Sequence, residues 1–226
     1  METDKRFRLP IASGGWQFIL PLAVLTVVLF LVGWKVGGVV AAGATLLVLY
    51  FFRDPERKPP RIVGAIVSPA DGRVTAIDEV EHGDFPNGRA RRISIFLSLF
   101  NVHVNRSPVE ARVVSVEYRP GRFRNAMSEA SARENERNTI HLRNGFLGVY
   151  IDQIAGILAR RVVCCCQRGD TVAQGQRIGL IRFGSRVDTF LPTEADVRVK
   201  RGMKVRGGET VLAILNPTPP DAAKRP

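Results

Sequence analysis

Cysteine and histidine are scarce in this chain of 226 residues. It has three of each, and the three cysteines are adjacent, at Cys164, Cys165 and Cys166. Neighbouring side chains on an extended strand point to opposite faces, so this run cannot provide a tetrahedral metal site, and we expect it to fill a strand or the core. The lack of spaced cysteine pairs argues against a disulfide framework, and therefore against an extracellular catalytic domain.

Acidic residues are also in short supply, with 21 Asp and Glu against 33 Lys and Arg, which gives a net charge of +12. A basic chain favours an anionic partner, either nucleic acid or a membrane surface. The arginines are not interleaved with an aromatic stacking platform, so we expect no nucleic acid. Beyond residue 52 the chain has 29 basic and 19 acidic residues and keeps +10 of the charge. We interpret this surplus as charge that faces an anionic bilayer.

Charge is missing altogether from two stretches near the N-terminus. Residues 16–34 and 36–52 contain no charged side chain, and only Lys35 separates them. At about 1.5 Å per helical residue, these blocks reach the lower limit for crossing a hydrocarbon core. We therefore expect residues 1–52 to form a membrane anchor, as two transmembrane helices or as a re-entrant hairpin. Basic residues on both flanks place both ends of the anchor in the cytoplasm.

Residues 53–216 form one domain's worth of chain, rich in short β-branched runs that Gly and Pro separate. We expect a mainly β (α+β) domain with strands at 62–67, 73–77, 93–100, 113–118, 177–183, 197–199 and 210–215. One helix is expected over 125–138, where Ser131 and Glu134 have the spacing of a capping box. The Pro-rich tail, 217–226, is predicted to be disordered.

One segment of this domain is repeated. The pattern of glycines and aliphatic residues in 169–181 recurs 33 residues later, in 202–214, which indicates one turn-plus-strand unit used twice. The repeat and the segment 68–74 resemble lipoyl and biotinyl carrier domains, whose fold is a sandwich-like barrel. Asp71 is not followed by the lysine that such carriers modify, so only the fold is implied. A membrane-anchored, non-catalytic adaptor with lipoyl-like modules is the alternative function that this pattern allows.

Polar residues follow the apolar strand expected at 93–99. Unbroken alternation would put three of them on its apolar face: Asn101, His103 and Asn105. Either the strand kinks near Phe100 or a polar cluster faces the interior. The flanking asparagines and Arg106 favour a functional site at His103 over a structural histidine.

Two turns provide further candidates. Ser68–Gly72 contains Asp71, and Phe183–Arg186 contains Ser185 directly after an apolar strand. Each sequence alone is typical of a surface turn. A serine hydroxyl needs an adjoining base to act as a nucleophile, and few histidines are available. His82 lies in a polar turn and is expected to be solvated, and His141 follows a charged run.

Five motifs, in this order, together resemble the phosphatidylserine decarboxylase family. They are Ser-Pro-Ala-Asp-Gly at 68–72, Phe-Asn-Val-His-Val-Asn-Arg at 100–106, Glu-Asn-Glu-Arg at 134–137, Gln-Ile-Ala-Gly with Ala-Arg-Arg at 153–161, and Phe-Gly-Ser-Arg at 183–186. The resemblance covers about 51–192 and is to the short, membrane-anchored bacterial and archaeal branch. It implies a carboxy-lyase of phospholipid biosynthesis that converts phosphatidylserine to phosphatidylethanolamine and CO2 through a Schiff base with a self-generated pyruvoyl group.

The resemblance also implies a self-processing proenzyme. Asp71 would orient His103, His103 would take the proton of the Ser185 hydroxyl, and the Ser185 oxygen would attack the Gly184 carbonyl. No metal is expected. Substrate contacts are expected from Asn101, Asn105, Arg106 and Arg186.

Cleavage between Gly184 and Ser185 would leave a β chain, 1–184, and an α chain, 185–226, that starts with the pyruvoyl group. Some branches carry a second histidine where this chain has Phe100, so the acid that reprotonates the product is unassigned, with His141 as a candidate. We expect the catalytic domain on the cytoplasmic face of the inner membrane. A homo-oligomer and another serine-headed lipid substrate are open alternatives.

Overall fold

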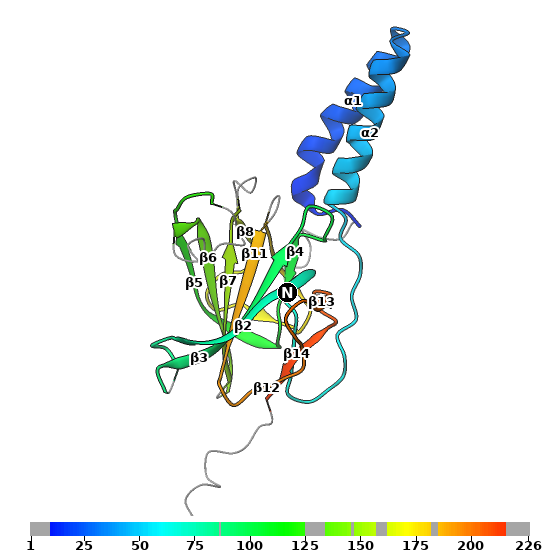
Figure 1. Ribbon diagram of the computed structural model, residues 1–226. Coiled ribbons are helices and arrows are strands. Elements are labelled where there is room, and N and C mark those ends of the chain that lie inside the picture. Colours follow the sequence, from blue (N-terminus) through cyan, green and yellow to red (C-terminus); the bar gives the residue numbers. More distant parts are fainter. Residues whose placement is uncertain are drawn as a thin grey trace, which may run out of the picture.

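The computed structural model describes residues 10–85, 87–124, 134–145, 147–156, 162–181 and 185–215. A pair of helices projects from one end of a β domain (Figure 1). Several sequence predictions lie outside the described residues: most of the expected helix with Ser131, the residue Gly184, and the tail 217–226.

Two antiparallel helices, α1 (Trp16–Leu31) and α2 (Lys35–Phe51), form the projecting hairpin. A 3-10 turn, η2 (Ser13–Gly15), precedes them. The Oγ1 atoms of Thr26 and Thr45 lie 3.2 Å apart between the helices, and each lies 2.8 Å from a carbonyl oxygen one turn earlier. These two hydroxyl groups thus have protein partners and need no water.

The hairpin corrects one expectation. Neither of its helices is long and apolar enough to cross a membrane, and the described part of the chain contains no other candidate. The first apolar block is longer than the helix it forms, because a turn at residues 32–34 takes up its last part. Gly33 adopts a φ of 79° in this turn, a conformation that glycine reaches without strain.

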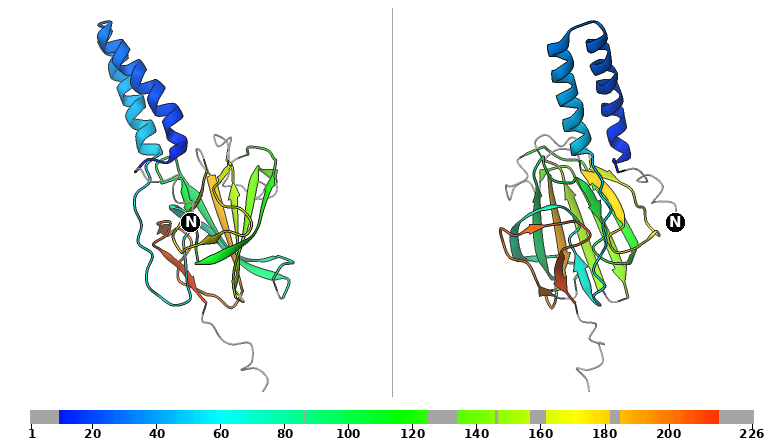
Figure 2. Two further views of the ribbon diagram at one scale, coloured as in Figure 1. Left: turned by 180° about the vertical axis from the view of Figure 1, so that it is seen from behind. Right: turned by 90° about the vertical axis from the view of Figure 1, so that its right-hand side faces the viewer.

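All named strands pair antiparallel, in one curled sheet of eight strands and two sheets of three (Figure 2). The large sheet has the order β13 (Lys204–Val205), β2 (Gly72–Glu81), β3 (Arg89–Leu97), β11 (Ser185–Leu191), β7 (Leu147–Ile154), β6 (Arg137–Asn144), β5 (Ala111–Arg119) and β9 (Thr171–Val172). The small sheets are β1 (Ala65–Val67), β14 (Val211–Ile214) and β12 (Asp196–Val197), and β4 (Val104–Arg106), β10 (Arg177–Ile181) and β8 (Val162–Cys164). The mainly β class is confirmed, while the likeness to a lipoyl-type sandwich stays a prediction.

The main core lies between these sheets. Alternate residues of β3 supply its centre, since Ile93, Ile95 and Leu97 are fully buried as the sequence pattern predicts. A smaller cluster joins the base of the hairpin to the β domain. It contains Phe51 and Phe52 at the end of α2, packed with Val102, Val104 and Leu180.

The repeat seen in the sequence is confirmed. Each copy has a turn, a two-residue strand, a second turn and a longer strand, which are β9 and β10 in one copy and β13 and β14 in the other. Glycines with positive φ stand at matching positions: Gly169 and Gly202, Gly175 and Gly208. Each copy also binds a Ser-Pro segment through the same 2.8 Å bond, from Gly175 N to Ser107 O and from Gly208 N to Ser68 O.

The expected helix over 125–138 is wrong at its C-terminal end. Strand β6 begins at Arg137, and Asn138 donates a 3.0 Å hydrogen bond to Gln153 on the neighbouring strand β7. Pairing between β6 and β7 thus outweighs the local helical pattern there.

Candidate active site

The candidate residues gather where the base of the hairpin meets one end of the large sheet. Ser185, the first residue of β11, pairs with Leu97 at the end of β3. Gly72, next to Asp71, lies so close to β3 that a Cβ atom would be 2.2 Å from the Phe96 oxygen. The turn with Asp71 is therefore beside the strand that positions Ser185, and glycine is required for that approach.

His103 follows a sharp turn that ends β3. The Asn101 side chain closes this turn by accepting hydrogen bonds from Ser98 N at 2.9 Å and Ser98 Oγ at 2.7 Å. The kink expected near Phe100 is thus present, and His103 and Asn105 are nevertheless fully buried. His103 and Asn105 therefore face the interior, because the chain changes direction at the turn between Ser98 and Asn101.

The imidazole of His103 is held in one tautomer. Its Nδ1 lies 2.9 Å from the Asn101 carbonyl oxygen, which only accepts, so Nδ1 carries the proton and Nε2 presents a lone pair. Burial, with a contribution from the nearby Arg53 cation, lowers the pKa of His103 to about 4. The residue is therefore neutral at pH 7. Nε2 is buried and has no hydrogen-bond partner among the described residues.

Ser185 has the same kind of orphaned atom. Its Oγ is buried, and the described part of the chain offers it no hydrogen-bond partner. Ile181 N donates to the His103 carbonyl oxygen at 3.3 Å, and Ser185 follows only four residues later. Four residues of extended chain reach at most ~14 Å, so His103 and Ser185 belong to one neighbourhood. The unprotonated Nε2 of His103 and the hydroxyl of Ser185, each without a hydrogen-bond partner among the described residues, thus lie on adjoining segments.

Asp71 is engaged with other groups. Its Oδ1 accepts a 2.7 Å bond from Gly207 N, and its Oδ2 accepts a 2.9 Å bond from Arg57. Burial raises the pKa of Asp71, although the Gly207 bond and the Arg57 cation both oppose this. The expected contact from Asp71 to His103 is not seen between these two described residues, and the Asn101 carbonyl orients the imidazole instead. The role of Asp71 in processing stays a prediction.

The four residues expected to bind substrate have internal partners. Asn105 accepts a 2.8 Å bond from Gln153, and Asn101 closes the turn before His103. Arg186 is buried and paired with Asp188 at 2.6 Å and with Ser94 at 3.0 Å. Arg106 is buried as well. These contacts make the four residues part of the framework, and their contact with substrate stays a prediction.

A buried ion cluster fixes the segment between the hairpin and the β domain. Asp54 is completely buried, and it accepts bonds from Arg106 at 2.9 Å and from Arg177 at 2.7 Å. Arg177 also reaches the exposed Glu56 at 2.7 Å. Burial raises the pKa of Asp54, against the lowering effect of the two guanidinium groups.

A cationic pocket opens at the base of the hairpin, with a volume of about 480 Å3. It is lined by Pro10, Arg53, Pro55, Arg57, Asp71, Val102 and Arg206. Val102 precedes His103, so the pocket reaches the backbone of the candidate site. The sequence showed Arg53 and Arg57 only as part of the basic flank of the anchor. It did not predict a pocket shared with Arg206, because the linker and the last repeat come together only in the fold.

The other two histidines lie far from Ser185. His141 pairs with Tyr150, which pairs with Phe190, five residues along β11 from Ser185. At about 3.4 Å per residue this is ~17 Å, so the structure does not bring His141 to the site. His82 is also not solvated as expected, since its ring packs on Phe85, Tyr150 and Phe190 at centroid distances of 4.6 to 5.0 Å.

Within the described ranges, no group of three or more His, Cys, Asp or Glu side chains could hold a metal ion. The geometry itself offers a neutral imidazole base at His103 and a serine hydroxyl at Ser185, both buried.

Comparisons with known proteins extend this picture. A family model described as phosphatidylserine decarboxylase matches residues 44–213. The phosphatidylserine decarboxylase proenzyme of Ruegeria pomeroyi is 44% identical over 221 residues, which cover 95% of this chain and 100% of that protein. The proenzyme of the same name from Symbiobacterium thermophilum is 47% identical over 206 residues, 91% of this chain and 95% of that protein. That of Nitrosomonas europaea is 45% identical over 205 residues, 90% and 94% of the two chains.

Proposed function

The chain belongs to the phosphatidylserine decarboxylase family, and on this premise we propose how its residues serve that activity. The protein is a carboxy-lyase that converts phosphatidylserine to phosphatidylethanolamine and CO2. As the relatives' names designate proenzymes, we propose a precursor that cuts itself between Gly184 and Ser185. One observation carries the proposal. Ser185 Oγ and His103 Nε2 are buried, unpartnered among the described residues, and on segments that meet.

In the proposed processing step, His103 Nε2 takes the proton of the Ser185 hydroxyl, and Ser185 Oγ attacks the Gly184 carbonyl carbon. The Gly184–Ser185 peptide bond breaks and an ester forms. Elimination frees the Gly184 carboxylate and leaves a dehydroalanine at position 185. Water then replaces its nitrogen, which leaves as ammonia, and residue 185 becomes a pyruvoyl group. The products are the β chain, 1–184, and the α chain, 185–226.

The residues around position 185 fit this cofactor. Among the described residues the buried Ser185 hydroxyl has no hydrogen bond that must break before it reacts, and β11 is held on both sides by β3 and β7. Once formed, the pyruvoyl carbonyl supplies the electron sink that decarboxylation requires. The cationic pocket supports binding of the substrate, because Arg53, Arg57 and Arg206 suit a headgroup with phosphate and carboxylate charges.

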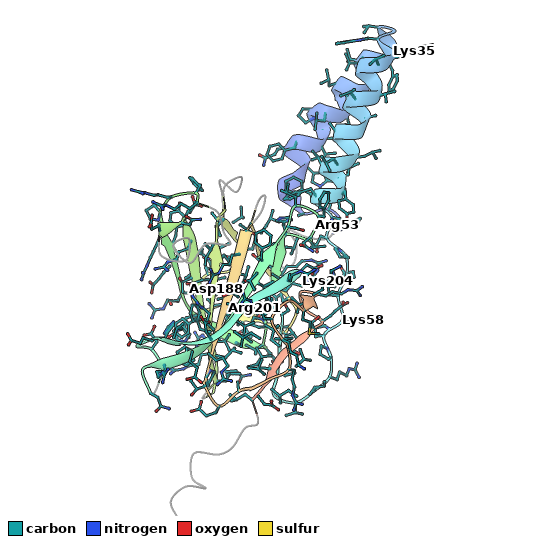
Figure 3. All side chains as sticks on the ribbon, viewed as in Figure 1. Lys35, Arg53, Lys58, Asp188, Arg201 and Lys204 are labelled. Carbon is teal, nitrogen blue, oxygen red and sulfur yellow. The ribbon has the colours of Figure 1, made fainter. Side chains whose placement is uncertain are left out.

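We also propose that the hairpin inserts into the cytoplasmic leaflet as a re-entrant element. Both helices expose large apolar side chains along their length, including Leu25, Leu31, Val36 and Leu46. Figure 3 places Lys35 at the tip and Arg53 at the base of the hairpin. Arg53 stacks on Tyr50 at 3.8 Å, and Phe100 is 67% exposed beside them, a combination typical of a membrane interface.

Mass spectrometry of the purified protein in detergent tests the processing proposal. The wild type should give two chains, with a pyruvoyl group at the start of the smaller one, and should release CO2 from phosphatidylserine vesicles. Ser185→Ala should stay a single, inactive chain. Thr189→Val is the matched control, because Thr189 is another hydroxyl on β11 that is buried and has no partner in the part of the chain that the structure describes, and it should be dispensable for cleavage. A single wild-type chain with full activity would overturn the mechanism.

A further inference from the structure

The three adjacent cysteines have no part in the proposed decarboxylase chemistry, yet the fold sorts them into two environments. Cys165 packs into the small cluster at the base of the hairpin, and Cys166 belongs to the main core. Cys164, the last residue of β8, points to the same side as Cys166. The alternation expected from the sequence is therefore present, and it brings the outer two thiols together.

The two outer sulfur atoms are in direct contact. Cys164 Sγ lies 3.5 Å from Cys166 Sγ and 3.3 Å from the Cys166 carbonyl oxygen. A disulfide bond is about 2.05 Å long, so an approach of about 1.5 Å would join them. The regular strand β8 ends at Cys164, so Cys166 lies outside its ladder of backbone hydrogen bonds.

The surroundings favour reaction at Cys164. Its side chain is part exposed, whereas that of Cys166 is buried. The hydrogen bond offered by the Cys166 thiol lowers the pKa of Cys164 to about 7, and the same interaction raises the pKa of Cys166. A thiolate is the attacking form in thiol–disulfide exchange, so Cys164 is the entry point and Cys166 the resolving thiol.

We propose that Cys164 and Cys166 form a redox-active dithiol site, which a low-molecular-weight disulfide oxidises reversibly to an intrachain disulfide. The Cys164 thiolate attacks one sulfur of the small disulfide and expels a thiolate. The Cys166 thiolate then attacks the Cys164 sulfur and expels the second one. The protein loses two electrons and two protons, and the small disulfide is reduced to two thiols.

The site lies beside β10, the strand that precedes Ser185 in the chain. Cys164 pairs with Gly179 of β10, whose other neighbour, β4, pairs Asn105 with the same Gly179. In a reducing cytosol the pair rests as thiols, and a disulfide there is a transient response to oxidant.

The test is peptide mass spectrometry on the full chain in detergent. The reduced protein is exposed to oxidised glutathione, alkylated and digested with trypsin, which releases residues 162–168 as one peptide with all three cysteines. We expect this peptide to lose two hydrogens and to carry a single alkyl group, on Cys165, and dithiothreitol should restore three alkyl groups.

Three variants sharpen the result. Cys165→Ser should still form the disulfide, whereas Cys164→Ser and Cys166→Ser should not. Prior unfolding in urea should abolish the preference for the outer pair. Glutathione adducts without an internal disulfide, or a disulfide that requires Cys165, would overturn the proposal. Because the readout is mass and not CO2 release, the result is independent of the proposed processing mechanism.

Discussion

The ring of Phe51 stacks on the imidazole of His103, with centroids 4.2 Å apart and planes tilted by 35°. Phe51 is the last residue of α2, so the helical hairpin itself covers the proposed base. The same end of α2 is tied to the turn before His103, because Arg53 donates a 2.7 Å bond to the Phe100 carbonyl oxygen. The position of the hairpin therefore sets the environment of the imidazole.

Replacement of this ring should change the pH dependence of self-cleavage. In Phe51→Ala the imidazole gains solvent, and we expect the pKa of His103 to rise from about 4 toward its ordinary 6.5. Cleavage at about pH 5.5 should then be ~10-fold slower than at about pH 8, while the wild type changes little. The measurement is the rate of chain cleavage after cell-free synthesis in detergent. Phe18→Ala is the control, since Phe18 stacks on Phe52 at 5.8 Å. An equal pH effect in both variants would contradict the assignment.

The stability of the uncleaved chain should also depend on His103. Its folded pKa of about 4 is below its unfolded value of 6.5, so the unfolded state binds more protons between these values. The contribution of His103 to the free energy of unfolding is therefore fully present above about pH 6.5. It falls by ~3 kcal/mol as the pH is lowered toward about 4. Urea unfolding of Ser185→Ala across this range measures it. The same chain with His103→Asn, which keeps a donor for the Asn101 carbonyl, should lack this component, and an unchanged slope would contradict the prediction.

The buried Asp54 should be critical for folding. Asp54→Asn leaves Arg106 and Arg177 without their shared carboxylate in a buried site, and we expect a loss of ~3–5 kcal/mol in the free energy of unfolding. Glu56→Gln is the matched control, because Glu56 contacts the same Arg177 but its side chain is 84% exposed. That variant should lose less than about 1 kcal/mol. Urea titration in detergent compares the two, and similar losses would show that burial of Asp54 is not what matters.

The cationic pocket should affect the use of substrate without affecting self-cleavage. Arg206 lines the pocket with its side chain 74% exposed, so Arg206→Gln should leave the fold intact. We expect a ~5-fold higher KM for phosphatidylserine in mixed micelles at low salt, with a smaller difference at high salt. Arg198→Gln, at an exposed arginine paired with Asp196, is the control. Equal KM changes in both variants would indicate general attraction to the anionic surface instead of a pocket.

Local sequence patterns predicted the strands that have β-branched runs between turn signals, such as β2, β5 and β14. They did not predict β11, whose sequence contains Arg186 and Asp188. These two side chains are buried and satisfy each other at 2.6 Å, so a central strand tolerates them. No local pattern can show that pairing, because it depends on β3 and β7 covering the strand on both sides.

The candidate site was predictable in part. His103 and Ser185 were found from their motifs, and the structure places them on adjoining buried segments. The hydrogen-bond partner of His103 could not be predicted. It is the backbone carbonyl of Asn101, and every residue has such a group, so no sequence pattern marks it. The contacts of Phe51 with His103 and of Arg57 with Asp71 were not predicted either, because each joins an anchor or linker residue to a distant turn of the β domain.

The order of strands in the large sheet decides what a break before Ser185 would do to the molecule. Strand β11 lies between β3 and β7, and β13 and β14 pair with β2 and β1. The strands of a fragment that begins at residue 185 would therefore remain paired with strands of the larger fragment, and β11 would keep hydrogen bonds on both of its edges. Such fragments could separate only by global unfolding, so the cut protein would need neither a disulfide nor a linker to remain one particle.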